Sequence, residues 1–290
     1  MSEQSKYQLL SPVSAGESGD LLAGKPSEDA LRRVQALLAD WLRMENVIVL
    51  TGAGCSFHAG GRLMAGPRAN NLECLVLDAV EKCDLPPRAA SILRHRKASW
   101  PTNENSGPVG FEDWLSCLFN ASGLTNPDNS PVAAVVWKGE VPEGEEPPLM
   151  VADGDLIKLR SLVEKAIFAE CALHIDRGEL SGASDGQSSG HIPFLAKLIA
   201  RDTNLGRTHL FTLNYDTLFE QAMEELGIQY FDGFSGRASS RFDPAVYGLD
   251  IYYPGDVSEG RARRFDKFLQ YYKLHGSLHW YVCDDGMYRA

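Results

Sequence analysis

Two short stretches in the second half of this chain carry side chains that suit chemistry on a polar substrate. Asn214 and Asp216 lie two residues apart in TLNYD, and His275 precedes Gly276 in KLHGS. A neutral amide can bind a ribose hydroxyl, a carboxamide or an attacking water without adding charge. A histidine can act as a general base or hold a ribose hydroxyl near neutral pH. Both stretches are therefore candidates for a catalytic site.

A third stretch, TGAGCS at residues 51–56, has the composition of a phosphate-binding turn. Gly52 and Gly54 would let backbone N–H groups approach a phosphate closely, and a helix start would favour the negative charge. The dinucleotide fingerprint is incomplete, because Phe57 stands where its last glycine would be. No Gly-Lys-Ser/Thr follows, so the stretch is not a Walker A loop. A plain turn between a strand and a helix remains the alternative.

The two polar stretches also have structural alternatives. Asn214 could be the N-cap of the helix that follows it, with Asp216 in the first turn. His275 could be a core histidine that bonds to its own loop. His275 and His279 have a spacing that aligns two metal ligands only on a helix, whereas a strand is expected to precede them. We therefore expect no metal site.

Composition narrows the class of protein. The chain has 290 residues, a net charge of -11 and 44% hydrophobic residues, as in a soluble globular protein that does not bind nucleic acid or an anionic membrane through its bulk charge. The six cysteines form no CxxC pair, which argues against a structural zinc site and a disulfide framework and favours a reducing cytoplasm. Neither a signal peptide nor an apolar run of membrane-spanning length is visible.

Hydrophobic periodicity and turn residues predict an alternation of helices and strands. Helices are expected over 28–44, 110–120, 155–177, 192–201 and 215–226. Strands are expected over 46–51, 208–214, 228–234 and 267–274. The first strand, NVIVLT, reads as one that is buried on both faces. Polar segments over 1–26, 121–155 and 178–191 read as leader, insertion and connector.

This alternation is typical of an α/β fold with a mostly parallel sheet. In such sheets the ligand binds beyond the carboxyl ends of the strands. TGAGCS, TLNYD and KLHGS each follow an expected strand, so we expect all three at one ligand-binding edge.

The three motifs, in this order, resemble the sirtuin-like (silent information regulator two type) family, in particular its bacterial branch of antiphage-defence NADases. The resemblance covers roughly residues 46–60, 110–120 and 207–280. It implies a Rossmann-like, mostly parallel sheet with helical insertions, forming an NAD-binding domain over 27–290 behind a flexible leader of 1–26. The insertion would occupy about 60–205. The family continues with further strands beyond this point, so we expect a C-terminally incomplete fragment of a longer protein.

The resemblance also assigns residues to a site that uses NAD+ as substrate. The catalytic pair would be Asn214 and His275. The residues that contact NAD+ would be Gly52, Ala53, Gly54, Ser56, Thr212 and Asp216. The FEDWL segment, 111–115, is similar to an acidic helix start of this branch and makes Asp113 a further pocket candidate.

Three departures from deacylating sirtuins bear on the reaction. A four-cysteine zinc module should follow the catalytic histidine, but only Cys283 does. GGRLMAG replaces the Pro-Asp-Phe-Arg that should follow the glycine turn, and Leu213 stands where those enzymes have Gln. These losses argue against acyl-lysine chemistry and leave the groups needed to hold NAD+ and attack its glycosidic bond.

The resulting expectation is an NAD+ glycohydrolase without a metal, which cleaves NAD+ to nicotinamide and ADP-ribose and so aborts phage infection. The resemblance implies a cytoplasmic protein that forms a homo-oligomer or acts with a partner effector or sensor. The alternatives are an NAD-dependent protein deacylase, a catalytically silent module that senses NAD or ADP-ribose, and a structural α/β domain.

Overall fold

A computed structural model describes residues 27–64, 71–98, 110–124, 135–136, 149–175, 190–236, 238–254, 263–283 and 285–289. The expected leader, much of the 121–155 insertion and most of the 178–191 connector lie outside these residues. The chain forms two compact units. The first comprises Met1–Leu50, Ile192–Phe211 and Met223–Tyr272, and the second comprises Thr51–His191, Thr212–Ala222 and Lys273–Ala290.

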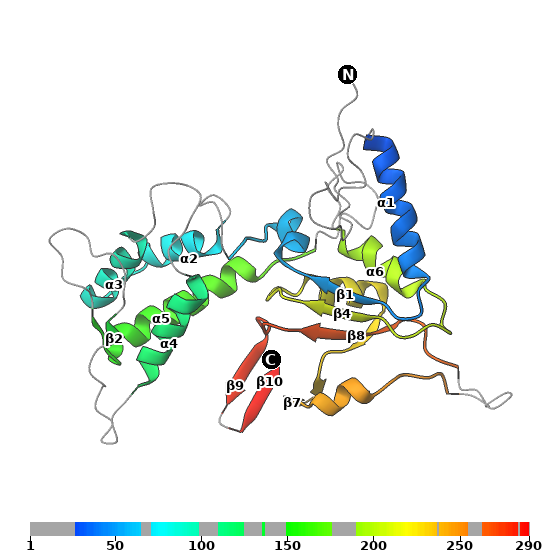
Figure 1. Ribbon diagram of the computed structural model, residues 1–290. Coiled ribbons are helices and arrows are strands. Elements are labelled where there is room, and N and C mark those ends of the chain that lie inside the picture. The colour runs from blue at the N-terminus through cyan, green and yellow to red at the C-terminus, as the bar shows by residue number, and fades with distance from the viewer. Residues whose placement is uncertain are drawn as a thin grey trace, which may run out of the picture. The chain divides into compact units, whose positions relative to one another are not determined.

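The first unit is built on a four-stranded sheet with helices packed beside it. The strands, in spatial order, are β1 (Ile48–Thr51), β4 (His209–Thr212), β8 (Phe268–Lys273) and β5 (Gln229–Phe231). β5 and β8 pair in parallel, and His209 N–H donates to the Val47 carbonyl at 3.1 Å. Helices α1 (Ser27–Leu42) and α6 (His191–Ile199) lie on the same side of this sheet (Figure 1). The expected α/β class with a parallel sheet is confirmed.

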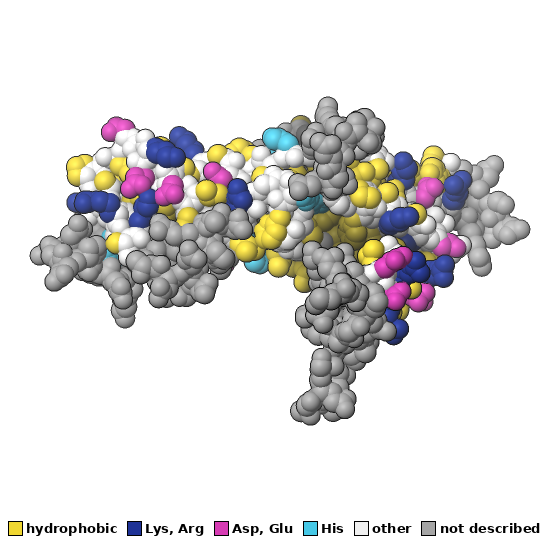
Figure 2. All heavy atoms as spheres, turned by 90° about the horizontal axis from the view of Figure 1, so that it is seen from above, with side chains coloured by type: hydrophobic (Ala, Val, Ile, Leu, Met, Phe, Trp, Pro, Cys, Tyr) yellow, Lys and Arg dark blue, Asp and Glu magenta, His cyan; other side chains and the backbone are white. Residues whose placement is uncertain are grey.

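The expectation for the first strand was wrong in one respect. β1 is at the edge of the sheet, and Ile48 and Leu50 are 72% and 65% exposed. An unbroken apolar run indicates a strand but does not say how many of its faces are covered. Leu38 and Trp41 of α1 are also exposed, and hydrophobic side chains are visible at the surface in Figure 2.

The last residues of β1, β4 and β8 are Thr51, Thr212 and Lys273, and all three belong to the second unit. Within the second unit, backbone hydrogen bonds join these residues to the segments that follow them. Leu213 N–H donates to the Thr51 carbonyl at 3.0 Å, and Leu274 N–H donates to the Thr212 carbonyl at 2.9 Å. The segments that follow the three strands therefore start side by side, as the sequence predicted.

Four helices supply the core of the second unit. They are α2 (Leu72–Glu81), α3 (Pro87–Ala98), α4 (Phe111–Gly123) and α5 (Gly154–Cys171). Leu77, Trp114 and Leu159 are among the buried side chains of this core. A buried ion pair joins Arg96 Nε to Glu73 Oε1 at 2.5 Å. This helical bundle falls inside the expected insertion, although periodicity predicted only α4 and α5 in it.

Short elements complete the two units. The second unit has the pairs β2 (Val135–Val136) with β3 (Leu149–Met150) and β9 (Trp280–Cys283) with β10 (Gly286–Arg289). The first has β6 (Phe234–Ser235), β7 (Ser240–Phe242) and the 3-10 helix η4 (Pro244–Gly248). Helix α7 spans Leu218–Leu226, three residues shorter at its start than expected. Among the described residues, no helix is long and apolar enough to cross a membrane.

Candidate active site

The glycine turn after β1 leads into a helix, as expected, and this is a 3-10 helix, η1 (Ala53–Ala59). A Cβ placed on Gly52 would come no closer than 3.9 Å to Leu213, and one placed on Gly54 would meet nothing within 4 Å. The backbone is therefore open at both glycines, which leaves room for a ligand to approach. A helix of this type and length adds little dipole, so phosphate binding here would depend on individual N–H groups.

Ser56 is the residue of the glycine turn whose side chain is buried in the candidate site. Its side chain is 2% exposed, and Gly61 folds back over it with an N–H bond to the Ser56 carbonyl at 2.8 Å. A Cβ on Gly61 would stand 2.6 Å from the Ser56 Cβ, closer than side chains can pack. Glycine at 61 is thus required by the close approach to Ser56.

Ser56, Asn214 and Asp216 form one hydrogen-bonded group. Ser56 Oγ donates to Asp216 Oδ2 at 2.6 Å, and Asn214 Nδ2 donates to Ser56 Oγ at 2.8 Å. The exposed fractions of Asn214 and Asp216 are 8% and 7%. Buried polar groups are costly unless they are paired, so this arrangement holds the three side chains in one geometry.

The same contacts decide between the two readings of Asn214. Asp216 Oδ1 accepts the Leu218 N–H at 3.2 Å, so the residue that supports the start of α7 is Asp216. Asn214 instead directs its side chain at Ser56 from the adjacent segment. Its backbone N–H donates to Thr212 Oγ1 at 3.1 Å, which gives Thr212 a supporting role. The N-cap reading of Asn214 is therefore wrong.

A buried lysine supports this group from the end of β8. Lys273 Nζ pairs with Glu220 Oε1 at 2.9 Å and also donates to the backbone carbonyl of Asp216. The Lys273 side chain is 2% exposed. Since a buried cation needs both an anion and further acceptors, these contacts fix the loop that carries Asp216 against the strand end.

Two histidines, His58 and His191, lie near the group formed by Ser56, Asn214 and Asp216. The rings of His58 and His191 are 5.2 Å apart, and His191 packs edge-on against Phe219 at 4.5 Å. Burial lowers the pKa of His191 to about 4; His58 acts in the same direction and Asp216 opposes it. His191 is therefore neutral at physiological pH.

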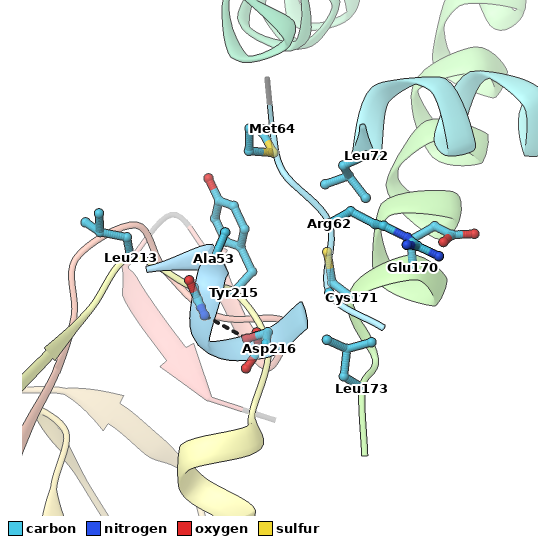
Figure 3. A pocket seen from close by; sticks show the side chains of 13 residues that line it. Ala53, Arg62, Met64, Leu72, Glu170, Cys171, Leu173, Leu213, Tyr215 and Asp216 are labelled. Carbon is cyan, nitrogen blue, oxygen red and sulfur yellow. Dashed lines mark hydrogen bonds between the residues drawn. The ribbon is translucent and has the colours of Figure 1, made fainter. Parts of the chain in front are cut away.

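A small cavity of about 70 Å³ opens beside the group (Figure 3). We call it the Asn214 cavity. It is lined by Ala53, Ser56, Gly61, Arg62, Met64, Leu72, Glu170, Cys171, Leu173, Leu213, Asn214, Tyr215 and Asp216. Arg62, Glu170 and Cys171 come from one side of it, and Ala53, Tyr215 and Asp216 from the other (Figure 3). Its volume suits a few water molecules and is well below that of a nucleotide pocket.

His275 lies in a different cavity. It is exposed, two residues beyond β8, and lines an open cavity of about 500 Å³ together with Glu112, Leu115, Ser116, Phe119, Asn120 and Tyr215. We call this the α4 cavity. Tyr215 lines both cavities, and its ring centroid is 6.4 Å from that of His275. The structure thus brings Ser56, Asn214 and Asp216 together and separates them from His275 by one aromatic ring.

The other residues that the sequence predicted for the site lie in or near the two cavities. Ala53 lines the Asn214 cavity. Asp113 is in the first turn of α4, and its Oδ2 lies 3.0 Å from where a Cβ on Gly110 would stand, so it points back over the start of its own helix. Gly276 adopts a left-handed φ of 91°, which explains a glycine after His275 by the turn itself. His275 and His279 are not on a helix.

The cavity residues that were not predicted from the sequence include Tyr215, Glu112, Arg62 and Cys171. Tyr215 and Glu112 each stand next to a predicted residue, so the motif position was a usable signal. Arg62 and Cys171 gave none, because they reach the Asn214 cavity from the η1–α2 loop and the end of α5. Burial, and secondarily Asp216, raise the pKa of the Cys171 thiol to about 11, so it is a neutral wall of the cavity. Within the described residues, no group of three or more His, Cys, Asp or Glu side chains is placed to hold a metal ion.

Comparison with protein families gives one match in the part of the chain that holds TLNYD and KLHGS. Residues 208–285 match the SIR2-like domain. The matched segment runs from the start of β4 to the β9–β10 turn and carries Asn214, Asp216 and His275. A comparison with curated proteins gives no match.

Proposed function

We propose, from the SIR2-like match over residues 208–285, that this chain is an NAD+ glycohydrolase that releases nicotinamide and ADP-ribose. SIR2-like domains are often NAD-using enzymes, so an NAD-related function is the general conclusion that the match supports. Hydrolysis, rather than transfer to an acyl-lysine, is the specific part of the proposal. It is supported by the replacement of the Pro-Asp-Phe-Arg and Gln positions by GGRLMAG and Leu213.

The observation that carries the proposal is the orientation of Asn214. The single Ser56 hydroxyl proton is given to Asp216, so Ser56 can only accept from Asn214, which fixes Nδ2 toward Ser56. The Asn214 carbonyl oxygen is then available to accept a hydrogen bond from a water in the Asn214 cavity. A neutral acceptor held this way can position the attacking water without binding it as a charged group does.

The proposed reaction assigns one role to each of these groups. The bond between ribose C1′ and the nicotinamide nitrogen breaks through an oxocarbenium-like transition state, and its electron pair stays with nicotinamide. The water held by Asn214 adds its oxygen to C1′. His275 accepts the proton that this water loses, or it orients a ribose hydroxyl and the proton passes to solvent. The pyrophosphate lies over the open backbone at Gly52 and Gly54.

Nicotinamide release from NAD+ tests this function directly. Wild-type protein is compared with Asn214→Ala and His275→Ala, and both variants should lose activity by about 10²- to 10⁴-fold, the usual worth of such groups. Equal rates of nicotinamide release in all three proteins would contradict the proposed mechanism. Binding of NAD+ without release, in any assembly state, would instead indicate a sensing module.

The proposed biological role rests on the resemblance of the three motifs to antiphage NADases. Depletion of NAD+ would abort infection in the cytoplasm, with activity held off until a trigger or partner arrives. Cells expressing the wild-type chain should lose NAD+ on infection, and cells expressing Asn214→Ala should not. Protein deacylation is distinguished by incubation with an acetyl-lysine peptide, which should give no acylated ADP-ribose.

A further inference from the structure

Most residues that line the α4 cavity have no role in the function proposed above. Glu112, Ser116 and Asn120 are four residues apart on α4 and form one polar row, flanked by Leu115 and Phe119. Tyr215 and His275 form the remaining lining. The volume of about 500 Å³ is within the range of small-ligand sites, whereas the Asn214 cavity is far below it.

The charge of this lining is one-sided. Among the described residues that line the cavity, Glu112 is the one carboxylate, and neither Lys nor Arg is present. The pKa of Tyr215 is raised, first by burial and next by the charge of Glu112, which places the Glu112 carboxylate within electrostatic reach of the Tyr215 ring. A phosphate would be repelled here, and a cation would be attracted.

The aromatic lining selects among cations. Tyr215 and Phe119 contribute aromatic rings to the lining, and a cation over an aromatic face is stabilised by the ring. The Phe119 ring already holds the Arg160 guanidinium at 4.6 Å from its centroid, so Tyr215 is the ring assigned to a bound cation. A flat cation can contact both the Tyr215 ring and the Glu112 carboxylate. The Ser116 hydroxyl and the Asn120 amide add hydrogen-bonding groups of the kind that a carboxamide and ribose hydroxyls require.

We propose that the α4 cavity binds the N-ribosylpyridinium end of the substrate, with Glu112 as its anionic contact and Tyr215 as its ring partner. This inference rests on the proposed function and names the part of the substrate that occupies this cavity. The ribose then lies at Tyr215, between the water held by Asn214 and the His275 imidazole. The pyrophosphate lies outside the cavity, on the side of Gly52 and Arg62.

Glu112 also acquires a role in the reaction. As the C1′–N bond breaks, the positive charge leaves the pyridinium and develops on the ribose, while nicotinamide departs neutral. A carboxylate beside the ribose stabilises this charge, as in glycoside hydrolysis. Glu112 is therefore assigned as a catalytic residue that touches the substrate.

The test compares binding of two probes to the full 290-residue chain, wild type and Glu112→Gln. The 1-methylnicotinamide cation carries the pyridinium charge, and nicotinamide is its neutral counterpart. In an NMR titration, Glu112→Gln should weaken binding of the cation about tenfold and leave nicotinamide unchanged. Tyr215→Leu should weaken binding of both. The matched control is Asp155→Asn, the same charge change in the first turn of α5, which should alter neither.

The rate of nicotinamide release distinguishes a failure of this inference from a failure of the proposed hydrolase function. If wild type and Glu112→Gln release nicotinamide from NAD+ with equal kcat and KM and bind the cation equally, the assignment of the cavity is wrong and the hydrolase stands. If the cation binds in a Glu112-dependent way but no protein releases nicotinamide, the site stands and the hydrolase is wrong. Because Glu112 is exposed, a thermal unfolding curve equal to that of wild type is expected for the variant.

Discussion

Ser56 Oγ accepts a hydrogen bond from Asn214 Nδ2 at 2.8 Å and donates its own proton to Asp216 Oδ2 at 2.6 Å. Ser56 and Asn214 are 158 residues apart in the chain, and the ends of the adjacent strands β1 and β4 bring them together. The contact determines which end of the amide faces the cavity. A serine of the glycine turn thereby acts through Asn214, in addition to any contact that it makes with a phosphate.

Ser56→Ala should therefore impair catalysis as a positioning change. Removing the hydroxyl leaves the buried Asn214 amide and Asp216 carboxylate without their shared partner, a loss of about 1–3 kcal/mol. Nicotinamide release should fall about 10- to 100-fold in kcat with a smaller change in KM, since the amide loses its orientation and the α4 cavity is untouched. Steady-state kinetics with NAD+ measure both constants.

Ser122→Ala is the control for this change. Ser122 is another buried serine, which donates to the Phe119 carbonyl at 2.8 Å within the helical bundle. Its loss should lower stability without lowering the kcat of the folded protein. A Ser56→Ala enzyme with wild-type kcat would contradict the positioning role.

Gly61→Ala should disturb Ser56 from the other side. The added Cβ would stand 2.6 Å from the Ser56 Cβ and 2.8 Å from its backbone, so the turn must shift. Overpacking of this kind costs about 1–3 kcal/mol and should reduce nicotinamide release together with stability. Gly123→Ala is the matched control, because its Cβ meets nothing within 4 Å at the end of α4. A Gly61→Ala protein as stable and active as wild type would show that the turn is not tightly packed.

Lys273→Met should destabilise the protein strongly. Glu220 would keep its charge in a largely buried place, and the Asp216 carbonyl would lose its donor. Breaking a buried pair in this way costs about 3–5 kcal/mol, measurable by urea unfolding. The double variant Lys273→Met, Glu220→Met should recover part of the loss, since no charge is left unpaired. Arg32→Met, in the exposed pair with Glu28, should cost no more than about 1 kcal/mol.

The sequence predicted those parts of the fold that depend on local pattern. The parallel sheet and the helices α1, α4, α5 and α6 follow from periodicity, and the alignment of three strand ends follows from the rule for parallel sheets. The exposure of Ile48 and Leu50 could not be predicted, because the position of β1 at the sheet edge is set by strand order and not by its own residues.

The candidate site divides in the same way. Ser56, Asn214 and Asp216 belong to motifs, and their contact was implied by adjacent strand ends. The separation of His275 from Asn214 by Tyr215 depends on side-chain direction, since residues 214 and 216 face one cavity and the intervening ring reaches the other as well. Arg62 and Cys171 enter from the loop and bundle side, and their place could be known only from the tertiary structure.

The pH dependence of stability should carry the signature of His191. Its pKa is lowered from 6.5 to about 4 by burial, so the unfolded chain binds a proton in this range that the folded chain does not. The free energy of unfolding should thus fall as pH decreases through the window from about 6.5 to about 4, and it should not depend on this residue above that window. His191→Phe keeps a ring against Phe219 and removes the titrating group.

Urea unfolding of wild type and His191→Phe at about pH 7.5 and about pH 4.5 measures the effect. Wild type should lose more stability between the two values than the variant does, because only wild type gains a proton at 191 on unfolding. His174→Phe, at an exposed histidine of the same unit, should leave the wild-type pH dependence nearly intact. If wild type and His191→Phe show the same pH dependence, His191 is protonated in the folded state at acidic pH. That result would contradict the conclusion that burial keeps His191 neutral.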